Sequence, residues 1–486
     1  MGAWRPLHKN HDMNTIVDLP SEILADILSK CDTRAVSETC KTFASVVYSL
    51  PWLWTSVRIH PHQYTLSGPE FLGARLARAK GALLDVAISF VPEHTIKISA
   101  LCKVLAKHNA QIRHFELTAQ DAMVGGAVVQ YVFPGVETYA ALEVLSVLLK
   151  REGDTTKREL PRLDKVLSHA PTVFPRLEKL HINSFYDSVP MPPLSTPFDH
   201  LTTLILDGAL EDELPTPGLL AALLNCTPWL ETLWMKHHFW ENHHDVDQPT
   251  AYGTNISLDL QLPRLKHLAV SVPGTACDLL RCITAPALED LHLDGSRGPG
   301  WDDTERPDFE WVDWVTESVQ RALKVFATRC TSVRRFAVTR AYLTRTGWEW
   351  VLFGEEGGGR GPPFPQLECI ALHGMFEYAN DLWSGFDDEL LERFACSPSI
   401  PLRRLVLMYC EFPLHASSVV AAFRASQAQG TKELECDDYV PLWDEDDQGE
   451  WEELLELGVA VWCKEGTEDL WWLAEHGIDG TDNDRY

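Results

Sequence analysis

The stretch PRLEKLHI at residues 175–182 decides the fold of this chain. Its apolar residues Leu180 and Ile182 alternate with polar ones, as a half-buried strand requires, and Leu177 anchors the turn that enters the strand. A proline before this leucine suits the start of a strand, where no ladder donor is needed. The phrase therefore predicts a short strand entered through a proline.

The same phrase, in the general form Pro-x-Leu-x-x-Leu-x-Leu, recurs through the middle of the chain. The interval between equivalent strand residues of successive phrases ranges from 23 residues (Leu268 to Leu291) to 45 residues (Leu291 to Phe336). The shorter intervals bracket the period of leucine-rich repeats and the longer ones exceed it. The alternative is an α/β domain in which these strand starts are coincidental, and nine copies disfavour it. The other copies are PWLETLWM (228–235), PRLKHLAV (263–270), PALEDLHL (286–293), PQLECIAL (365–372), and the weaker ALEVLSVL (141–148), HLTTLILD (200–207), SVRRFAVT (332–339) and LRRLVLMY (402–409).

Helical patterns lie between the phrases. GLLAALLN at 218–225 is one, and residues 312–328 form another, with similar patterns at 387–396 and 419–426. One strand and one helix per unit stack into a curved parallel sheet with helices outside. The pattern at 312–328 places on one helical face the residues Val315, Val319, Leu323 and Phe326.

A second informative segment precedes the repeats. Residues 19–59 read LPSEILADILSKCDTRAVSETCKTFASVVYSLPWLWTSVRI, which predicts two short amphipathic helices followed by a Leu-Pro-Trp-Leu-Trp sequence. A segment this short buries too little surface to be stable as an independent domain, so we expect a partner to cover part of its apolar face. A helical cap on the domain that follows, without any partner, is the alternative.

The pattern L-P-x-E-[IL]-L…C-K…P-x-L-W in this segment resembles the F-box, over about forty residues. In that family the segment docks on the Skp adaptor of a cullin–RING ubiquitin ligase. The resemblance also implies that Cys40, Phe43 and Trp54 hold the segment together. It implies that the adaptor-facing residues are Leu19, Pro20, Ile23, Leu24 and Ile27.

The whole chain resembles the leucine-rich-repeat F-box proteins, a class expanded in mushroom-forming fungi. This implies an α/β protein with a short α-helical F-box at 16–60, then an irregular leucine-rich-repeat solenoid at 61–435, its parallel strands on the concave side and its helices outside. LLDVAISF (83–90) and QIRHFELT (111–118) fit irregular first repeats of that class. We expect a disordered segment at 1–15. The acidic, tryptophan-rich residues 436–486 predict a terminal cap and tail, or alternatively a docking peptide for a basic partner.

Bulk properties exclude several classes of partner. The net charge is −28, and residues 433–486 hold 19 acidic and 2 basic residues, so a basic nucleic-acid footprint is absent. Neither an apolar run of membrane-spanning length nor a signal peptide appears, so we expect no membrane partner and a location in the cytoplasm, the nucleus or both. The twelve cysteines form no C-x-x-C pair, which predicts reduced thiols and no cysteine-based zinc site.

In a solenoid of this kind, alternate strand residues point into the concave face and can bind a target. Trp234 is the leading candidate because interface hot spots favour aromatic residues. A merely hydrated surface is the alternative for most of these positions. The candidates for target binding are His181, Asn183, Asp207, Trp234, Lys236, His267, His292, Asp294 and His373.

The sequence predicts neither a metal site nor a cofactor. His237, His238, His243 and His244 have ligand types that suit zinc or nickel, but they read as a polar loop after a strand. The glycines at 357–359 lack the lysine and hydroxyl residue of a phosphate loop, and no hydrolase, metalloprotease or kinase motif appears.

We therefore expect a substrate-recognition subunit of a cullin–RING ubiquitin ligase, without enzymatic activity of its own. The alternative is a repeat scaffold without a ligase role, because the inter-helix turn Cys31-Asp32-Thr33 is shorter than is usual in the family. An enzyme with a dispersed site is a third reading, which requires a deep pocket ringed by titratable groups.

Overall fold

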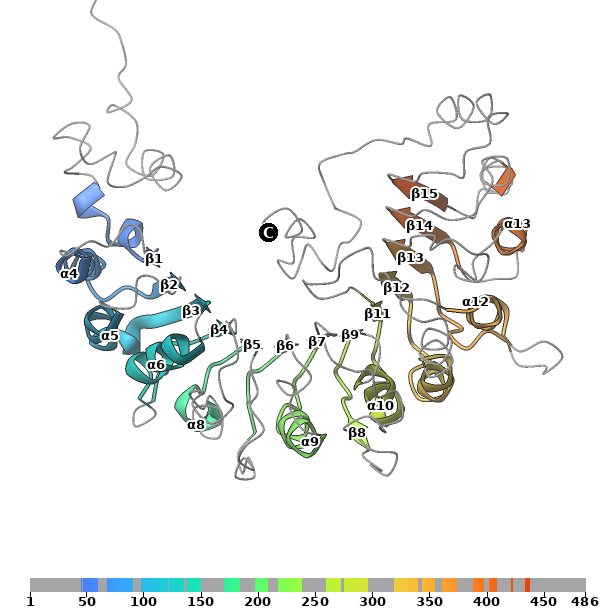
Figure 1. The fold of residues 1–486 in the computed structure, drawn as a ribbon, viewed down its shortest axis with the longest axis horizontal. Helices are drawn as coiled ribbons and strands as arrows, with labels where there is room; N and C mark the ends of the chain where they lie inside the picture. Colours follow the sequence, from blue (N-terminus) through green and yellow to red (C-terminus); the bar gives the residue numbers. More distant parts are fainter. Residues whose placement is uncertain are drawn as a thin grey trace, which may run out of the picture. The chain divides into compact units, whose positions relative to one another are not determined.

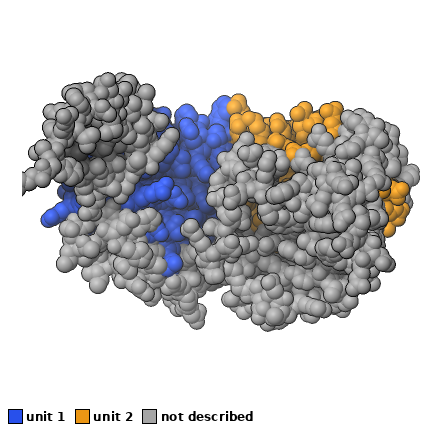
Figure 2. Space-filling view, turned by 90° about the horizontal axis from the view of Figure 1, so that it is seen from above, with its two compact units in different colours: residues 1–229 blue, residues 230–486 orange. Residues whose placement is uncertain are grey.

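The computed structural model divides the chain into two compact units, unit 1 (residues 1–229) and unit 2 (residues 230–486), coloured separately in Figure 2. Each unit is described by itself. The described residues are 45, 47–59, 68–90, 98–120, 122–134, 138–149, 170–183, 197–208, 217–237, 259–271, 275–295, 319–339, 343–354, 361–373, 388–396, 402–408, 421–422 and 433–437.

Unit 1 contains a parallel sheet in which strands follow one another in chain order, with the helices on one side (Figure 1). Every neighbouring pair from β1 to β6 is parallel. The strands are β1 (Ser56–Ile59), β2 (Leu84–Phe90), β3 (Ile112–Ala119), β4 (Val144–Leu149), β5 (Lys179–Ile182) and β6 (Thr203–Gly208). The helices are α4 (Gly68–Arg78), α5 (Ile98–Ala106), α6 (Ala122–Val132), α8 (Ala170–Val173) and α9 (Pro217–Asn225), with 3-10 turns η2 (Pro51–Trp54) and η5 (Asn109–Gln111).

Unit 2 repeats this arrangement, again with all sheet pairs parallel and the helices on one side (Figure 1). The strands, in sheet order, are β7 (Thr232–His237), β9 (His267–Ser271), β11 (Asp290–Asp294), β12 (Arg335–Thr339), β13 (Cys369–His373), β14 (Arg404–Met408) and β15 (Glu433–Asp437). A separate two-stranded sheet pairs β8 (Leu260–Gln261) with β10 (Ile283–Thr284). The helices are residues 319–327, α10 (Thr275–Cys282), α12 (Arg345–Phe353) and α13 (Asp388–Cys396).

The proline of the repeated phrase lies in the turn that enters the strand. Leu177 donates its N–H to the carbonyl of Phe174 at 3.1 Å, so Pro175 occupies the second position of a four-residue turn. Proline is favoured there because its fixed φ matches the turn. The same bond recurs from Leu265 to Leu262, from Leu288 to Ala285 and from Leu367 to Phe364.

A second repeated contact lies directly before the strands. The carbonyl of Glu143 accepts two hydrogen bonds from consecutive amides, those of Glu178 and Lys179, at 2.8 and 3.0 Å. This contact aligns the start of each strand with that of its neighbour, so the strands enter the sheet at the same level. The equivalent double acceptors are the carbonyls of Glu178, Glu231, Lys266, Glu289, Arg334 and Glu368.

The aligned starts place side chains in rows that cross the strands. We number the rows by strand position, with Asp85, Lys179 and Asp290 in row one. Rows two and four form the leucine face, which packs against the helices and contains the core, and rows one, three and five form the polar face. Row two consists of Val57, Val86, Phe115, Leu145, Leu180 and Leu204 in unit 1, and of Leu233, Leu268, Leu291, Phe336, Ile370, Leu405 and Leu434 in unit 2.

The predicted helices agree with the structure where it describes them. Residues 218–225 and 387–396 correspond to α9 and α13. Within 312–328 the described helix covers 319–327, and Val319, Leu323 and Phe326 are buried on one face as the spacing predicts. Of the pattern at 419–426, only residues 421 and 422 are described, and both are helical.

The domain boundaries predicted from the sequence differ from the sheet in two places. Ser56–Ile59 was assigned to the F-box, yet it forms β1 and pairs with β2. Strand β15 (Glu433–Asp437) crosses the predicted boundary between repeats and cap at residue 435. Before β1 the proline turn is present, since Leu53 donates its N–H to the carbonyl of Leu50 at 3.2 Å, but the strand begins one residue later after Pro51 than β5 does after Pro175. No proline stands shortly before β15.

Several predictions fall outside the described residues. These are the terminal segment 1–15, the C-terminal residues 438–486, and the histidines at 238, 243 and 244. The adaptor-facing residues Leu19, Pro20, Ile23, Leu24 and Ile27 are outside them too. Among the helices that are described, none has the length and apolar content to cross a membrane.

Candidate interaction surface

The residues predicted to bind a target lie at strand positions one, three and five, or directly after a strand. His267 lies in row one, and His181, Trp234 and His292 lie in row three. Asp207, Lys236, Asp294 and His373 take position five of their strands, and Asn183 follows β5 directly. His181, Asn183 and Asp207 belong to unit 1, where His181 lies beside Asp207, and the other six residues belong to unit 2.

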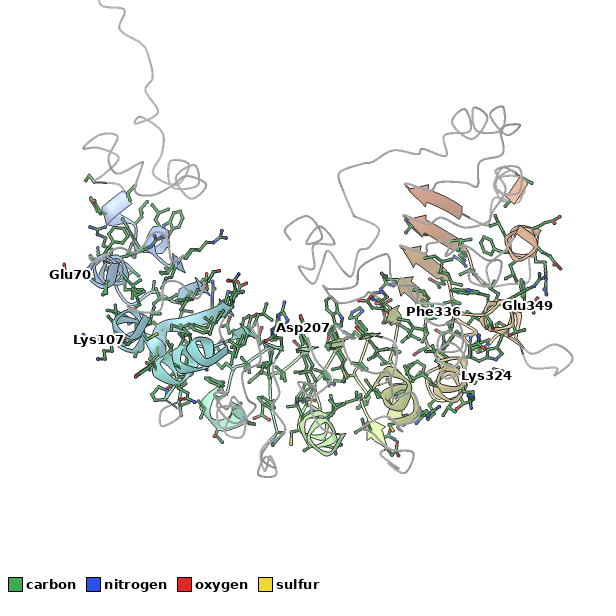
Figure 3. The ribbon with its side chains drawn as sticks, in the orientation of Figure 1. Glu70, Lys107, Asp207, Lys324, Phe336 and Glu349 are labelled. Atoms are coloured by element: carbon green, nitrogen blue, oxygen red, sulfur yellow. The ribbon has the colours of Figure 1, made fainter. Side chains whose placement is uncertain are left out.

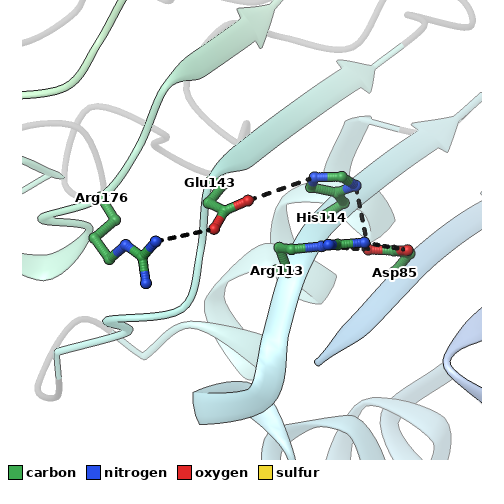
Figure 4. Close-up of polar contacts among 5 residues, drawn as sticks. All are labelled: Asp85, Arg113, His114, Glu143 and Arg176. Atoms are coloured by element: carbon green, nitrogen blue, oxygen red, sulfur yellow. Dashed lines mark hydrogen bonds and ion pairs between the residues drawn. The ribbon is translucent and has the colours of Figure 1, made fainter. Parts of the chain in front are cut away.

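A chain of ion pairs crosses the amino-terminal ends of the strands in unit 1 (Figure 4). Arg113 on β3 donates three hydrogen bonds to Asp85 on β2, with Nη2 to Oδ2 at 3.0 Å, Nη2 to Oδ1 at 3.1 Å and Nε to Oδ1 at 3.2 Å. His114 lies between Asp85 (3.2 Å) and Glu143 (3.9 Å), and Glu143 pairs with Arg176 at 3.3 Å. All five side chains are partly exposed. The charges are therefore paired within the chain. Each exposed pair contributes about 0–1 kcal/mol to the free energy of unfolding.

The hydrogen bond with Asp85 raises the pKa of Arg113, because the carboxylate stabilises the charged guanidinium. Lys179, in row one of β5, has the opposite shift. Burial lowers its pKa, and the nearby carboxylate of Glu116 opposes that effect. This part of the sheet thus holds one cation, Arg113, that a carboxylate stabilises, and one row-one cation, Lys179, that is partly desolvated.

His181 is the centre of a small polar group on β4, β5 and β6. Its Nδ1 lies 3.3 Å from Ser146 Oγ, and its Nε2 lies 4.0 Å from Asp207 Oδ2. His181 is 20% exposed, and Asp207 lies on the side of the ribbon away from Glu70 of α4 and Lys107, which directly follows α5 (Figure 3). The separation of 4.0 Å exceeds hydrogen-bond distance, so the group does not form a Ser-His-Asp catalytic relay. It presents hydrogen-bonding atoms at the polar face.

Asn183 has a structural role that the sequence prediction missed. Its Oδ1 accepts from the N–H of Leu149 at 2.6 Å, and its Nδ2 donates to the carbonyl of the same residue at 3.0 Å. Asn183 is buried, and it therefore satisfies the backbone N–H and carbonyl of Leu149, the last residue of β4. Its assignment as a target contact is replaced by this structural one.

Unit 2 has a related charged group. Asp290 on β11 accepts from Arg335 on β12, with Nη2 to Oδ2 at 2.9 Å and a second bond from Nε, and it also contacts Nδ1 of His267 on β9. The side chain of Asp290 is 8% exposed. Its two partners fill both sides of the carboxylate, as a buried charge requires.

Above this group, the polar face of unit 2 is closely packed. Trp234 and His292 are each 3% exposed, and Asp294 is also buried. His292 Nε2 lies 2.8 Å from Thr339 Oγ1 on the neighbouring strand. The expectation that Trp234 is the leading contact for a target does not fit its burial. The side chains of Lys236 and His373 are outside the described part of the structure.

The sequence analysis missed two exposed residues of row three in unit 1, Arg58 on β1 and Glu116 on β3. Glu116 could have been found from the alternation in Phe115-Glu116-Leu117, because both neighbours are buried. Arg58 was hidden by its place inside the predicted F-box boundary. Arg113 and Glu143 were missed because their role depends on pairing across strands.

The described residues contain no group of three or more His, Cys, Asp or Glu side chains arranged to hold a metal ion. Comparison with models of known protein families and with curated proteins finds no match to this chain.

Proposed function

We propose that this chain is the substrate-recognition subunit of a cullin–RING ubiquitin ligase. Its F-box-like segment would bind the Skp adaptor, and the polar face of the sheet would bind a protein target. The chain would perform no bond chemistry. It would raise the effective concentration of target lysines near the ubiquitin carrier, which is a proximity effect.

The observation that carries the proposal is the F-box-like pattern at 19–59 joined directly to a parallel repeat sheet. Trp54, near the end of that pattern, is buried and donates its Nε1–H to the carbonyl of Val47 at 2.9 Å. Its ring stacks on Tyr48 with centroids 5.6 Å apart, and the guanidinium of Arg78, the last residue of α4, lies 4.6 Å from the Trp54 ring. The end of the F-box-like segment is thus packed on α4. Such packing would hold a bound adaptor at a fixed place relative to the sheet that binds the target.

The second candidate is a repeat scaffold that binds partners without a ligase. It is favoured by the short turn Cys31-Asp32-Thr33 and by the polar residues Thr33, Arg34 and Glu38, which stand where the F-box family is usually apolar. The two functions differ in one property, which is binding to the Skp adaptor.

The test is a pull-down of the purified full chain with the Skp adaptor. We expect binding by the original chain and at least about tenfold weaker binding by a Leu24→Asp, Ile27→Asp double variant, because a carboxylate cannot occupy an apolar contact without losing its hydration. A matched control is the Leu83→Asp, Val325→Asp double variant, since both positions are exposed and lie outside the segment.

Circular dichroism must show that both double variants remain folded. Binding by the original chain and the control, with loss in the Leu24/Ile27 variant, supports the receptor. Absence of binding by the original chain supports the scaffold.

A further inference from the structure

The charged residues that directly precede row one alternate in sign across the sheet of unit 2. We call these positions row zero, and each lies one residue before its strand, within the contact that aligns the strand starts. The Cα atoms of neighbouring row-zero residues are therefore about 4.8 Å apart, the spacing of strands in a sheet. From β7 to β14 the row-zero residues of the main sheet are Glu231, Lys266, Glu289, Arg334, Glu368 and Arg403.

The described row-zero residues of unit 1 do not alternate in this way. Before β4, β5 and β6 they are Glu143, Glu178 and Thr202. Glu143 is also paired within the chain, with Arg176 at 3.3 Å. The alternating row is therefore a property of unit 2.

The six charges of unit 2 differ in whether they already have a partner. Lys266 Nζ lies 2.7 Å from Glu231 Oε2, so the first two charges satisfy each other. The other four side chains are exposed, and within the described part of the chain none of them takes part in an ion pair or a side-chain hydrogen bond. We call these four residues the edge charges: Glu289, Arg334, Glu368 and Arg403.

The edge charges are self-complementary. In one direction along the sheet they are acid, base, acid and base, and in the other direction they are base, acid, base and acid. A two-fold axis that passes between β12 and β13 would therefore place every acid of one copy opposite a base of a second copy. Glu289 would face Arg403 of the partner subunit. Arg334 would face Glu368 of the partner subunit, and the symmetry supplies the other two pairs.

The spacing of the two facing rows also matches, because the same strands of the same chain set it in both copies. Arginine suits such pairs, since its planar guanidinium can bind a carboxylate through two parallel hydrogen bonds. Each charge would in addition have opposite charges on both sides of its partner. A partner of another kind would have to reproduce the strand spacing, whereas a second copy has it already.

We propose that the amino-terminal edge of the sheet in unit 2 is a homodimer interface, in which the edge charges of two antiparallel copies pair. The net charge of −28 on each copy opposes association at long range. At physiological ionic strength, however, charges separated by more than about 8 Å are largely screened, while the paired groups are in contact. Since exposed ion pairs are individually weak, the dimer should exchange with monomer and should dissociate as salt is added.

Dimerisation would add a property to the proposed receptor without depending on it. A dimer carries two target-binding faces and two F-box-like segments, so a target with two recognition segments would be held with higher avidity. The contact itself involves neither the adaptor nor the target, because all four edge charges lie in unit 2. It can therefore be measured on the purified chain alone.

The test is sedimentation equilibrium of the full chain over a series of concentrations, for which we expect a monomer–dimer equilibrium. The acidic variant Arg334→Glu, Arg403→Glu has four acids at the edge, and the basic variant Glu289→Arg, Glu368→Arg has four bases. Each variant alone should dimerise at least about tenfold more weakly than the original chain, because like charges then face each other. An equimolar mixture of the two variants should form the heterodimer, since acids then face bases.

The basic variant separates specific pairing from general repulsion. Its net charge is less negative than that of the original chain, so general repulsion alone would make it dimerise more strongly. The matched control for the acidic variant is Lys103→Glu, Lys107→Glu, which changes the net charge by the same amount at two exposed positions of unit 1. This control should dimerise like the original chain, and circular dichroism must show that all variants are folded.

Three results would overturn the inference. The first is an original chain that stays monomeric at every concentration. The second is an acidic or basic variant that dimerises as strongly as the original chain, which would place the contact on another surface. The third is a mixture of the two variants that forms no heterodimer.

Discussion

Each unit contains a row-one aspartate that binds an arginine and a histidine, from one neighbouring strand (β3) in unit 1 and from two neighbouring strands (β9 and β12) in unit 2. In unit 1 Asp85 binds Arg113 and His114, and in unit 2 Asp290 binds Arg335 and His267. The carboxylate side chain is 33% exposed in the first and 8% exposed in the second. Strand register sets the position of a row-one side chain. We expect the burial of that side chain to decide how much its ion pairs contribute to the stability of the unit.

Row three shows the same contrast. In unit 1 it carries the exposed charges Arg58 and Glu116, whereas in unit 2 it carries the buried Trp234, Ala269 and His292. The leucine face does not differ in this way, because the residues of rows two and four whose burial the structure describes are apolar and buried in both units. The fold is therefore specified by one face of the sheet, and the other face is free to diverge in function.

Two buried cysteines allow each unit to be followed separately. Burial raises the pKa of Cys102 in unit 1 to about 12, and burial also raises the pKa of Cys330 in unit 2. Because the thiolate is the reactive form, both thiols should resist labelling in the folded protein. Labelling of each cysteine across a denaturant titration, read by mass spectrometry, then reports the unfolding of its unit.

The largest effect is expected for Phe115→Ala in unit 1 and Phe336→Ala in unit 2, which occupy equivalent row-two positions and are fully buried. Each should lower the free energy of unfolding of its unit by about 3–5 kcal/mol, through lost transfer energy and a cavity. The measurement is the shift of the Cys102 curve for the first variant and of the Cys330 curve for the second. A difference of several kcal/mol between the two would contradict the equivalence of the leucine faces.

The charged constellations should respond unequally. Asp290→Ala removes a buried carboxylate that binds Arg335 and His267, so unit 2 should lose about 1–3 kcal/mol of stability. Asp85→Ala removes an exposed pair, so unit 1 should lose about 0–1 kcal/mol. The same cysteine-labelling curves measure both. Equal losses would show that the difference in exposure has no energetic consequence.

A glycine tests how closely the helices approach the sheet in unit 1. A Cβ on Gly125 in α6 would lie 2.3 Å from Leu149 Cδ2 and 2.9 Å from Ala119 Cβ. Gly125→Ala should therefore destabilise unit 1 by about 1–2 kcal/mol, since the overlap outweighs the gain in helix propensity. Gly73→Ala in α4 is the control, because its Cβ would meet only Val104 at 3.8 Å. This control should be neutral or stabilising in thermal unfolding, and a destabilised control would refute the steric explanation.

The smallest effect concerns Lys179. Its pKa in the folded protein is lowered by burial below its usual value of 10.5, so the folded state binds this proton less tightly than the unfolded state. The stability of unit 1 should therefore rise as the pH increases from the folded pKa toward 10.5. Lys179→Met should remove this rise, which unfolding curves at neutral and alkaline pH can measure. A rise of the same size in the variant would assign it to another group.

The sequence predicted the repeated strands because apolar alternation recurs in all nine phrases and a proline begins five of them. It placed β5, β7, β9, β11 and β13 correctly. It did not separate β1 from the F-box-like segment, since Ser56–Ile59 has the alternation but no preceding phrase. Sequence reasoning also named the polar-face positions, because strand alternation fixes which residues share a face.

What sequence could not provide was the environment of each polar-face position. Trp234 and His181 occupy the same row, yet one is buried and the other is partly exposed. Asn183 was taken for a contact because nothing in the sequence shows that its amide binds the backbone of Leu149 in the previous repeat. Burial and pairing between repeats depend on residues that are distant in the chain.

The most direct test of the central claim is whether the full chain joins a preformed complex of the Skp adaptor and cullin, measured by sedimentation velocity. The account predicts one species that contains all three proteins, and its loss on introduction of Leu24→Asp and Ile27→Asp. A folded original chain that sediments separately from the adaptor–cullin complex would contradict the account and leave the chain as a scaffold without a ligase.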